Sequence, residues 1–143
     1  MGRIAAIDFG TVRLGLAISD ERKIIAQAIG IVHAGKNMLE TAKSVAQELA
    51  RFSALEKIVV GLPLLLSGRE GDMALAAKQF GAALEGVMSI PIVYWDERLT
   101  SAQVERTLKG ADMSRKKRSQ VVDKMAAVAI LQNYLESLSY DNR

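Results

Sequence analysis

The sequence predicts an α/β domain built on a mixed five-stranded sheet. Three strand-like segments come first, at about residues 3–9, 14–19 and 24–32, dense in Ile and Ala with Gly and charged residues between them. Helical and strand-like segments then alternate, as expected of parallel strands joined by crossover helices. We therefore expect an antiparallel meander with parallel additions, and functional groups at the carboxyl ends of its strands.

Local signals mark the later elements. Asn37 to Glu40 has the form of a capping box before a helix that reaches about residue 52, and Ser67 to Glu70 repeats this form before an alanine-rich helix to about residue 87. Apolar runs predict two more strands, at 57–62 and 90–95, the first of them buried on both faces. The remaining helices are expected at about residues 100–109, with Thr100 and Gln103 as the cap, and 119–138.

Composition is typical of one globular domain with a real core. The chain has 143 residues, 50% of them hydrophobic and 24% charged, with two prolines and no Gly/Ser-rich tract that could serve as a linker. We expect a single domain over residues 1–143. The absence of cysteine and the single histidine, His33, exclude a thiolate or His-rich zinc site, so any metal would be bound by oxygen.

The longest apolar run, Ile58 to Leu66, is too short to span a bilayer, and the N-terminus enters a strand without a basic leader. We therefore expect a cytoplasmic protein with no membrane partner. Its net charge is +3, but residues 106–118 contain six Lys or Arg and one Asp, a net +5, which leaves −2 elsewhere. The cluster Arg115, Lys116, Lys117 and Arg118 is either a phosphate-binding segment or a solvated basic loop.

Asp8 is the strongest candidate for a functional residue. It ends the apolar run 4–7 and precedes Gly10, Arg13 and Gly15, a pattern typical of strand, tight turn and strand. A carboxylate that closes a buried strand is costly unless a cation or several donors meet it. The alternative is that Asp8 only hydrogen bonds the backbone of its own turn. A metal ion is the obvious candidate for the cation.

Three further acids lie where they could join Asp8. Asp96 and Glu97 end the fifth strand, and Asp123 lies on the inward face of the last helix, among Ala126, Ala127 and Ile130. Taken separately, Asp96 and Glu97 could be a solvated pair at the end of a strand, and Asp123 could be an acid that stabilises the helix dipole. Together, carboxylates from three elements would repel one another unless divalent cations neutralised them.

Four motifs, in order and spacing, resemble those of the YqgF/RuvX family, bacterial RNase H-like nucleases described as Holliday-junction-resolvase-like or pre-16S rRNA nucleases. They are Asp8-x-Gly10-x-x-Arg13-x-Gly15-x-Ala17-x-Ser19-Asp20, Val60-Gly61-Leu62-Pro63-Leu64, Asp96-Glu97-Arg98-Leu99-Thr100 and Asp123-x-x-Ala126-Ala127. The resemblance covers nearly the whole chain. One departure is that Leu65-Leu66-Ser67 precede Gly68, where the family commonly has a polar loop.

The resemblance implies an RNase H-like fold and a catalytic, metal-binding triad of Asp8, Glu97 and Asp123, with Asp96 as the alternative to Glu97. Asp8 would bridge two Mg²⁺, or Mn²⁺, roughly 3.5–4 Å apart, which activate a water and stabilise the leaving oxygen. Arg13 and Arg98 would bind phosphates or pair with nearby acids. The basic segment 115–118 would contact the nucleic-acid backbone beside the metals.

The function expected from the resemblance is metal-dependent hydrolysis of phosphodiester bonds, at the 5′ end of pre-16S rRNA during ribosome biogenesis. One alternative is a Holliday junction resolvase acting on branched DNA, which would require a homodimer. Another is a non-catalytic nucleic-acid-binding module on the same scaffold. The sequence leaves structured RNA or branched DNA, and monomer or homodimer, open. Asp-x-Gly-Thr-x-x-x-Gly also resembles the first phosphate loop of actin/Hsp70 ATPases, but these bind nucleotide between two domains and this chain is long enough for one.

Overall fold

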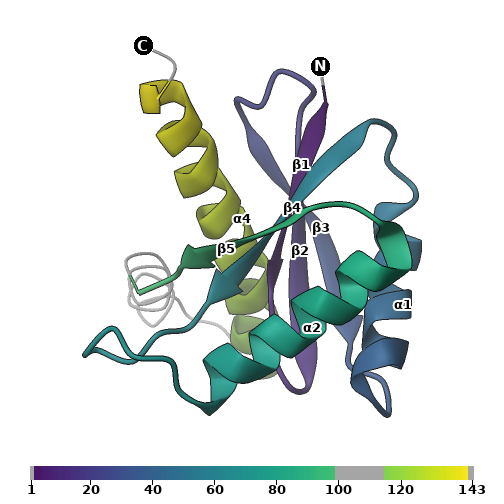
Figure 1. Ribbon diagram of the computed structural model, residues 1–143, viewed down its shortest axis with the longest axis vertical. Helices are drawn as coiled ribbons and strands as arrows, with labels where there is room; N and C mark the ends of the chain where they lie inside the picture. Colours follow the sequence, from purple (N-terminus) through teal and green to yellow (C-terminus); the bar gives the residue numbers. More distant parts are fainter. Residues whose placement is uncertain (1, 99–114, 142–143) are drawn as a thin grey trace.

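A five-stranded mixed sheet organises the fold in the computed structural model, which describes residues 2–98 and 115–141, without the side chains of residues 115–124 and 140–141 (Figure 1). The strand order is β3-β2-β1-β4-β5. The strands are β1 (Arg3–Asp8), β2 (Arg13–Ser19), β3 (Ala26–His33), β4 (Leu55–Leu62) and β5 (Ile92–Asp96). The helices are α1 (Met38–Leu49), α2 (Asp72–Met88) and α4 (Arg115–Asp141).

The strand directions confirm the expected meander with parallel additions. β1 pairs antiparallel with β2, and β2 with β3, whereas β1 with β4 and β4 with β5 are parallel. The carboxyl ends of β1, β4 and β5 therefore lie at one edge of the sheet. In register, Ile7 lies opposite Val60 and Leu62 opposite Asp96, so the residues that follow Ile7 and Asp96 flank the end of β4.

Helices cover both faces of the sheet (Figure 1). On one face, α1 and α2 contribute Val45, Phe80 and Leu84 to a core that includes Ala5 and Ile7 of β1. On the other face, α4 packs Ala127, Ile130 and Leu131 against Ile4, Ala6 and Val59. Alternate residues of β1 thus enter opposite cores, which explains why β1 and β4 are continuous apolar runs without a polar face.

The start of α1 confirms its predicted cap, but the second capping box is wrong. Asn37 Oδ1 accepts a hydrogen bond from the Glu40 N–H at 2.9 Å. By contrast, α2 begins at Asp72 after Gly71, and Ser67 Oγ accepts the N–H of Arg69 at 3.4 Å within its own turn. Ser and Thr hydroxyls serve local turns as readily as helix caps, so the pattern alone could not locate the helix start.

The last helix starts earlier than predicted, at Arg115 in place of Ser119. Residues 115–118 therefore form its first turn and not a solvated loop. The reason is local, because Arg and Lys are good helix formers and neither Gly nor Pro interrupts the run. The helix predicted at 100–109 lies outside the described residues, and the single-domain boundary stays a prediction. No helix within residues 2–98 and 115–141 combines the length and apolar character needed to cross a membrane.

Two glycines of α2 should respond to the same substitution in opposite directions. A Cβ on Gly81 would collide with the Tyr94 hydroxyl, which donates to the Lys78 carbonyl at 3.1 Å, whereas a Cβ on Gly86 would meet nothing within 4 Å. Gly81→Ala should lower the free energy of unfolding by about 1–3 kcal/mol through overpacking. Gly86→Ala should raise it by about 0.5–1 kcal/mol, because alanine favours the helix. Urea denaturation measures both, and equal effects would contradict the Tyr94 contact.

Candidate active site at the carboxyl edge of the sheet

Asp8 and Glu97 meet at the carboxyl edge of the sheet, across the end of β4. Asp8 is half-buried at the last position of β1, and Glu97 directly follows β5. Their carboxyl groups are hydrogen-bonded to each other. The Glu97 N–H donates to the Leu62 carbonyl at 3.3 Å, which extends the β4–β5 ladder by one residue and directs the Glu97 side chain back over the strands.

Gly61 provides the space in which this contact forms. A Cβ on Gly61 would overlap Glu97 Oε2 and lie 2.6 Å from Ile130 Cδ1 of α4. Glu97 Oε2 is itself buried. Glycine inside a strand commonly marks a close approach of another group, and here that group is the carboxylate. Gly61 was not among the site residues predicted from the sequence, although a glycine within the apolar run 58–62 was the available signal.

The environment of Glu97 disfavours its ionised form. Burial raises the pKa of Glu97 above its ordinary value, the hydrogen bond with Asp8 lowers it, and the nearby charge of Asp96 raises it further. Burial dominates, so the pKa is raised overall. A partly buried acid with a raised pKa beside a second acid is a common feature of functional sites, because such a pair costs stability without a counter-charge.

Asp96 has a different environment from its neighbour. Its carboxylate accepts hydrogen bonds from the Arg98 side chain, at 2.6 Å from Nη2 and 2.9 Å from Nε, and from the Arg98 N–H at 3.0 Å. The Arg98 guanidinium holds the pKa of Asp96 below its usual range. The structure therefore brings Glu97 to Asp8 and pairs Asp96 with Arg98.

Asp123 can be placed only through the backbone of α4. It lies in this helix before Ala126, Ala127 and Ile130, all of which are buried, as the sequence predicted for the inward face. Ile130 also borders Gly61, so the same stretch of α4 approaches the carboxyl edge of β4. The structure describes only the backbone of Asp123 and of the basic residues 115–118.

The donor set of Asp8 and Glu97 fits a hard divalent cation. Carboxylate oxygens are the ligands that Mg²⁺ prefers, and Mg²⁺ commonly takes only one or two of them from a protein. Among the side chains that the structure describes, no group of three or more His, Cys, Asp or Glu could hold a metal. Asp123, whose side chain is not described, lies outside that set.

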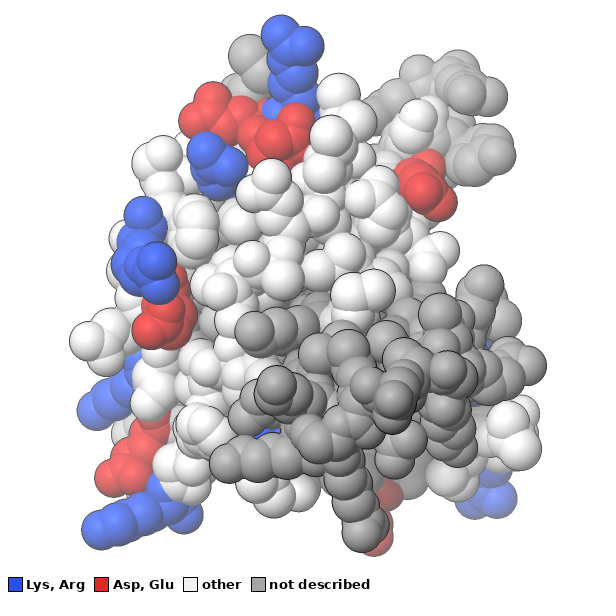
Figure 2. All heavy atoms as spheres, turned by 180° about the vertical axis from the view of Figure 1, so that it is seen from behind, with Lys and Arg blue, Asp and Glu red and all other residues white. Residues whose placement is uncertain are grey.

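Two other residues were predicted to contact nucleic acid, Arg13 and Arg98. Arg13 is half-buried at the start of β2, opposite His33. Arg98 is the ion-pair partner of Asp96, and 37% of the Arg98 side chain is exposed. On the face seen from behind, described charges of both signs lie mostly along the rims (Figure 2). The coloured surface in that view carries no continuous basic patch.

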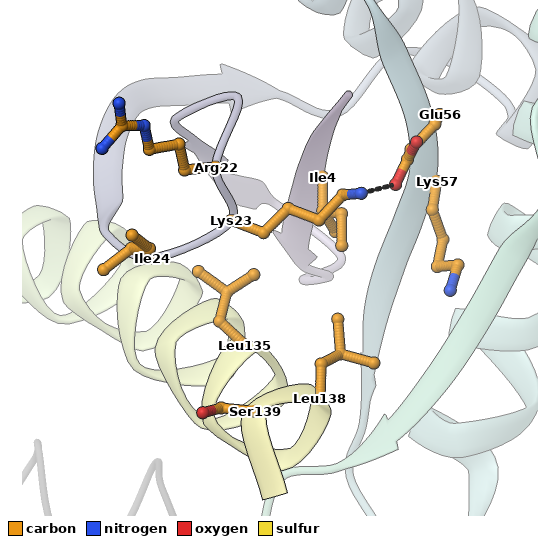
Figure 3. A pocket seen from close by; sticks show the side chains of 9 residues that line it. All are labelled: Ile4, Arg22, Lys23, Ile24, Glu56, Lys57, Leu135, Leu138 and Ser139. Carbon is orange, nitrogen blue, oxygen red and sulfur yellow. Dashed lines mark ion pairs between the residues drawn. The ribbon is translucent and has the colours of Figure 1, made fainter. Parts of the chain in front are cut away.

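A cavity of about 700 Å³ lies at the opposite end of the sheet (Figure 3). Its walls come from the amino end of β1, the β2–β3 hairpin, the start of β4 and the end of α4, and Lys23 and Glu56 form an ion pair at 2.5 Å beside it. Because Ile4 lines this cavity and Asp8 lies at the other end of β1, it is separate from the Asp8–Glu97 pair.

The fold resembles solved Holliday junction resolvases. The chain resembles the RuvC protein of T. thermophilus, solved with a Holliday junction substrate, with a TM-score of 0.56 and 16% identity over 96% of each chain. It also resembles the Fowlpox virus resolvase, solved with Holliday junction DNA, with a TM-score of 0.50 and 15% identity over 95% of this chain and 98% of that one. At these identities the likeness concerns the fold, and it confirms the predicted RNase H-like class.

Sequence relatives cover nearly the whole chain. A protein of Protochlamydia amoebophila is 46% identical over 94% of this chain and 93% of its own length, and one of Bacillus subtilis is 42% identical over 96% and 99%. Both carry the name "Putative pre-16S rRNA nuclease". The family model described as "RuvX: Holliday junction resolvase" matches residues 2–137. The chain therefore belongs to the RuvX family and to the nucleases, hydrolases that act on phosphodiester bonds.

Proposed function

We propose that this nuclease processes the 5′ end of precursor 16S rRNA in the cytoplasm, with Asp8, Glu97 and Asp123 as catalytic ligands of divalent metal ions. The observation that carries the proposal is the contact between Asp8 and Glu97 over Gly61. Two acids held together in a partly buried place cost free energy unless cations neutralise them. Resolvase-like nucleases generally use divalent metal ions, and the two carboxyl groups suit that role.

The chain's own residues would hold and shape the reaction centre. When bound, Mg²⁺ or Mn²⁺ would supply activation of a water and stabilisation of the leaving oxygen. Asp8, at the centre of the edge, is the proposed shared ligand, with Glu97 on the β5 side and Asp123 from α4. Gly61 and Ile130 keep the floor beneath the carboxylates apolar, which limits the water around them and strengthens electrostatic interactions there.

The first turn of α4 is the proposed contact for the nucleic-acid backbone. Arg115, Lys116, Lys117 and Arg118 add positive charge at the helix N-terminus, where the macrodipole is already positive and no acidic residue lies in the first turn. Such an arrangement favours a bound anion, and phosphates are the anions that a nuclease brings. Arg13 and the exposed part of Arg98 are proposed as further phosphate contacts nearer the acids.

Two substrate classes remain as candidates within the nuclease family. The names of the relatives support precursor rRNA, while the description of the family model supports a Holliday junction. Junction resolution would need a homodimer that places two active sites on symmetric strands, whereas trimming of one RNA strand works with a monomer. We favour rRNA processing because the matched relatives at 42–46% identity carry that name.

Cleavage of the two substrates side by side tests the proposal. Purified protein should cut an RNA that carries the precursor 16S 5′ leader in the presence of Mg²⁺ and leave it intact in EDTA. A four-way DNA junction at the same concentration should be cut at least about tenfold more slowly, a difference of about 1.4 kcal/mol in the activation free energy. Faster, paired cleavage of the junction by a dimer would instead make the protein a resolvase. Cleavage in EDTA would remove the metal from the mechanism.

Asp8→Asn should abolish hydrolysis and preserve binding. The amide keeps the shape of the side chain but removes the charge that would hold the metal ions, so the rate should fall to less than about a tenth of the wild-type rate. Single-turnover cleavage and a filter-binding assay measure the two properties. Glu56→Gln is the matched control, because Glu56 pairs with Lys23 at the opposite end of the sheet and should leave the rate unchanged. Retained activity in Asp8→Asn would remove Asp8 from the mechanism.

Glu97→Gln should stabilise the metal-free protein at neutral pH. The pKa of Glu97 is raised in the folded state. Glu97 therefore contributes fully to the free energy of unfolding below its ordinary pKa of 4.5, and this contribution is lost as the pH rises through the raised pKa. Glu97 therefore contributes less to the stability of the fold at pH 7 than at pH 4. The Tm of Glu97→Gln should exceed that of the wild type at pH 7, and the difference should shrink towards pH 4.

Mg²⁺ provides the complementary measurement for Glu97. It should raise the Tm of the wild type, since a ligand that binds only the folded state stabilises it, and raise that of Glu97→Gln less. A Tm difference between the two proteins that does not change with pH would show that titration of Glu97 does not contribute to it.

A further inference from the structure

The loop between β4 and α2 carries a leucine that is almost completely exposed. Leu66 has 99% of its surface accessible, and Leu65 beside it 52%. This is the segment where the sequence departs from the polar loop common in the family. A single exposed leucine is ordinary in a soluble protein, so exposure alone implies nothing. Two further features, the hydrogen-bonded turn that carries this residue and the position of that turn, distinguish it.

A tight turn holds Leu66 outward. The Gly68 N–H donates to the Leu65 carbonyl at 2.8 Å, and the Leu65 N–H donates to the Arg69 carbonyl at 2.9 Å. Gly68 has a φ of +86°, a conformation that other residues rarely adopt. Leu65 folds back toward Gly71, where a Cβ would lie 3.3 Å from Leu65 Cδ2. The turn therefore closes on itself and leaves Leu66 at its tip.

The turn lies beside the candidate active site. A Cβ on Gly68 would be 3.6 Å from Arg98 Nη1, and Arg98 is bound to Asp96, which directly precedes Glu97. Figure 1 shows this loop, in teal, projecting beyond the edge of the sheet between β4 and α2. The loop thus presents an apolar tip, with Arg69 three residues further along the chain and Arg98 beside Gly68, at the edge where the substrate backbone would approach.

We propose that Leu66 is a wedge that inserts at a base step next to the scissile phosphate, where it separates two stacked bases while Arg69 and Arg98 contact the flanking phosphates. This inference rests on the proposed nuclease function and deepens it. Apolar side chains of this kind enter base steps in several nucleic-acid-binding proteins, and the cost of unstacking is offset by closer contact with the protein. The ligand class is a base step in a helix, and substrates already unstacked there should need the wedge least.

Cleavage kinetics on two matched RNAs test the wedge. One is a continuous stem that contains the mapped cleavage position, and the other is the same stem with an unpaired bulge at that step. Leu66→Ala should lower kcat/KM on the continuous stem by about tenfold or more and on the bulged stem by less than about twofold, because the bulge supplies what the wedge otherwise provides. Leu66→Phe should keep most of the wild-type preference. Ile24→Ala is the control, since Ile24 is 57% exposed and lines the distal cavity.

Fluorescence of 2-aminopurine provides a readout of the base step itself. The probe is placed next to the scissile phosphate, and binding is measured in an Asp8→Asn background to prevent cleavage. Binding should raise the fluorescence several-fold when Leu66 is present and much less in Leu66→Ala. Because Leu66 buries no surface in the fold, its replacement should leave the Tm unchanged.

The outcomes separate the wedge from the nuclease function. If the wild type cuts both RNAs and Leu66→Ala cuts them equally well, the nuclease function stands and the wedge is overturned. Equal losses on the two RNAs would make Leu66 a general binding contact and also overturn the wedge. Failure of the wild type to cut any RNA with Mg²⁺ present would overturn the proposed substrate and the inference together.

Discussion

The contact between Asp8 and Glu97 is the constraint on which the rest of the site depends. Two acids touch in a place where burial already raises the pKa of Glu97, and this arrangement is unfavourable for the isolated protein. The contact between the two acids persists because the positions of their backbones in β1, β4 and β5 bring the two side chains together. Asp8 ends β1, Glu97 extends the β4–β5 ladder by one hydrogen bond, and Gly61 between them has no side chain to separate the two carboxyl groups. The fold therefore contains an unfavourable electrostatic interaction that a bound cation would relieve.

The helix behind the sheet completes this arrangement through packing. Ala126, Ala127 and Ile130 are buried against the strands, and the small alanines allow α4 to approach closely. Ile130 reaches the same glycine that accommodates Glu97, so one position in β4 receives a carboxylate and an aliphatic side chain. Trp95 and Tyr134 add an edge-to-face contact, with ring centroids 5.5 Å apart, that ties β5 to α4. Displacement of α4 would consequently disturb β5 and the acids at its end.

The two neighbouring acids Asp96 and Glu97 lie in different electrostatic environments. Asp96 and Glu97 are adjacent in the chain, yet Arg98 binds the first and the fold turns the second towards Asp8. The pKa of one carboxyl falls and that of the other rises, which separates a structural anion from a group that a cation can stabilise. Arg98 also lies close to the turn that carries Leu66, because a Cβ on Gly68 would be 3.6 Å from its Nη1.

The sequence alone determined the strand pattern, the mixed sheet and the acidic positions, because these depend on local periodicity and on residues that end apolar runs. It also indicated the inward face of α4, since helical spacing places Ala126, Ala127 and Ile130 together. It could not locate the start of α2 or α4, where Ser67 and the basic run are compatible with either a loop or a helix. Only the tertiary structure decided between Asp96 and Glu97 as the partner of Asp8. That choice depends on strand register and on the space above Gly61, both of which involve residues far apart in the chain.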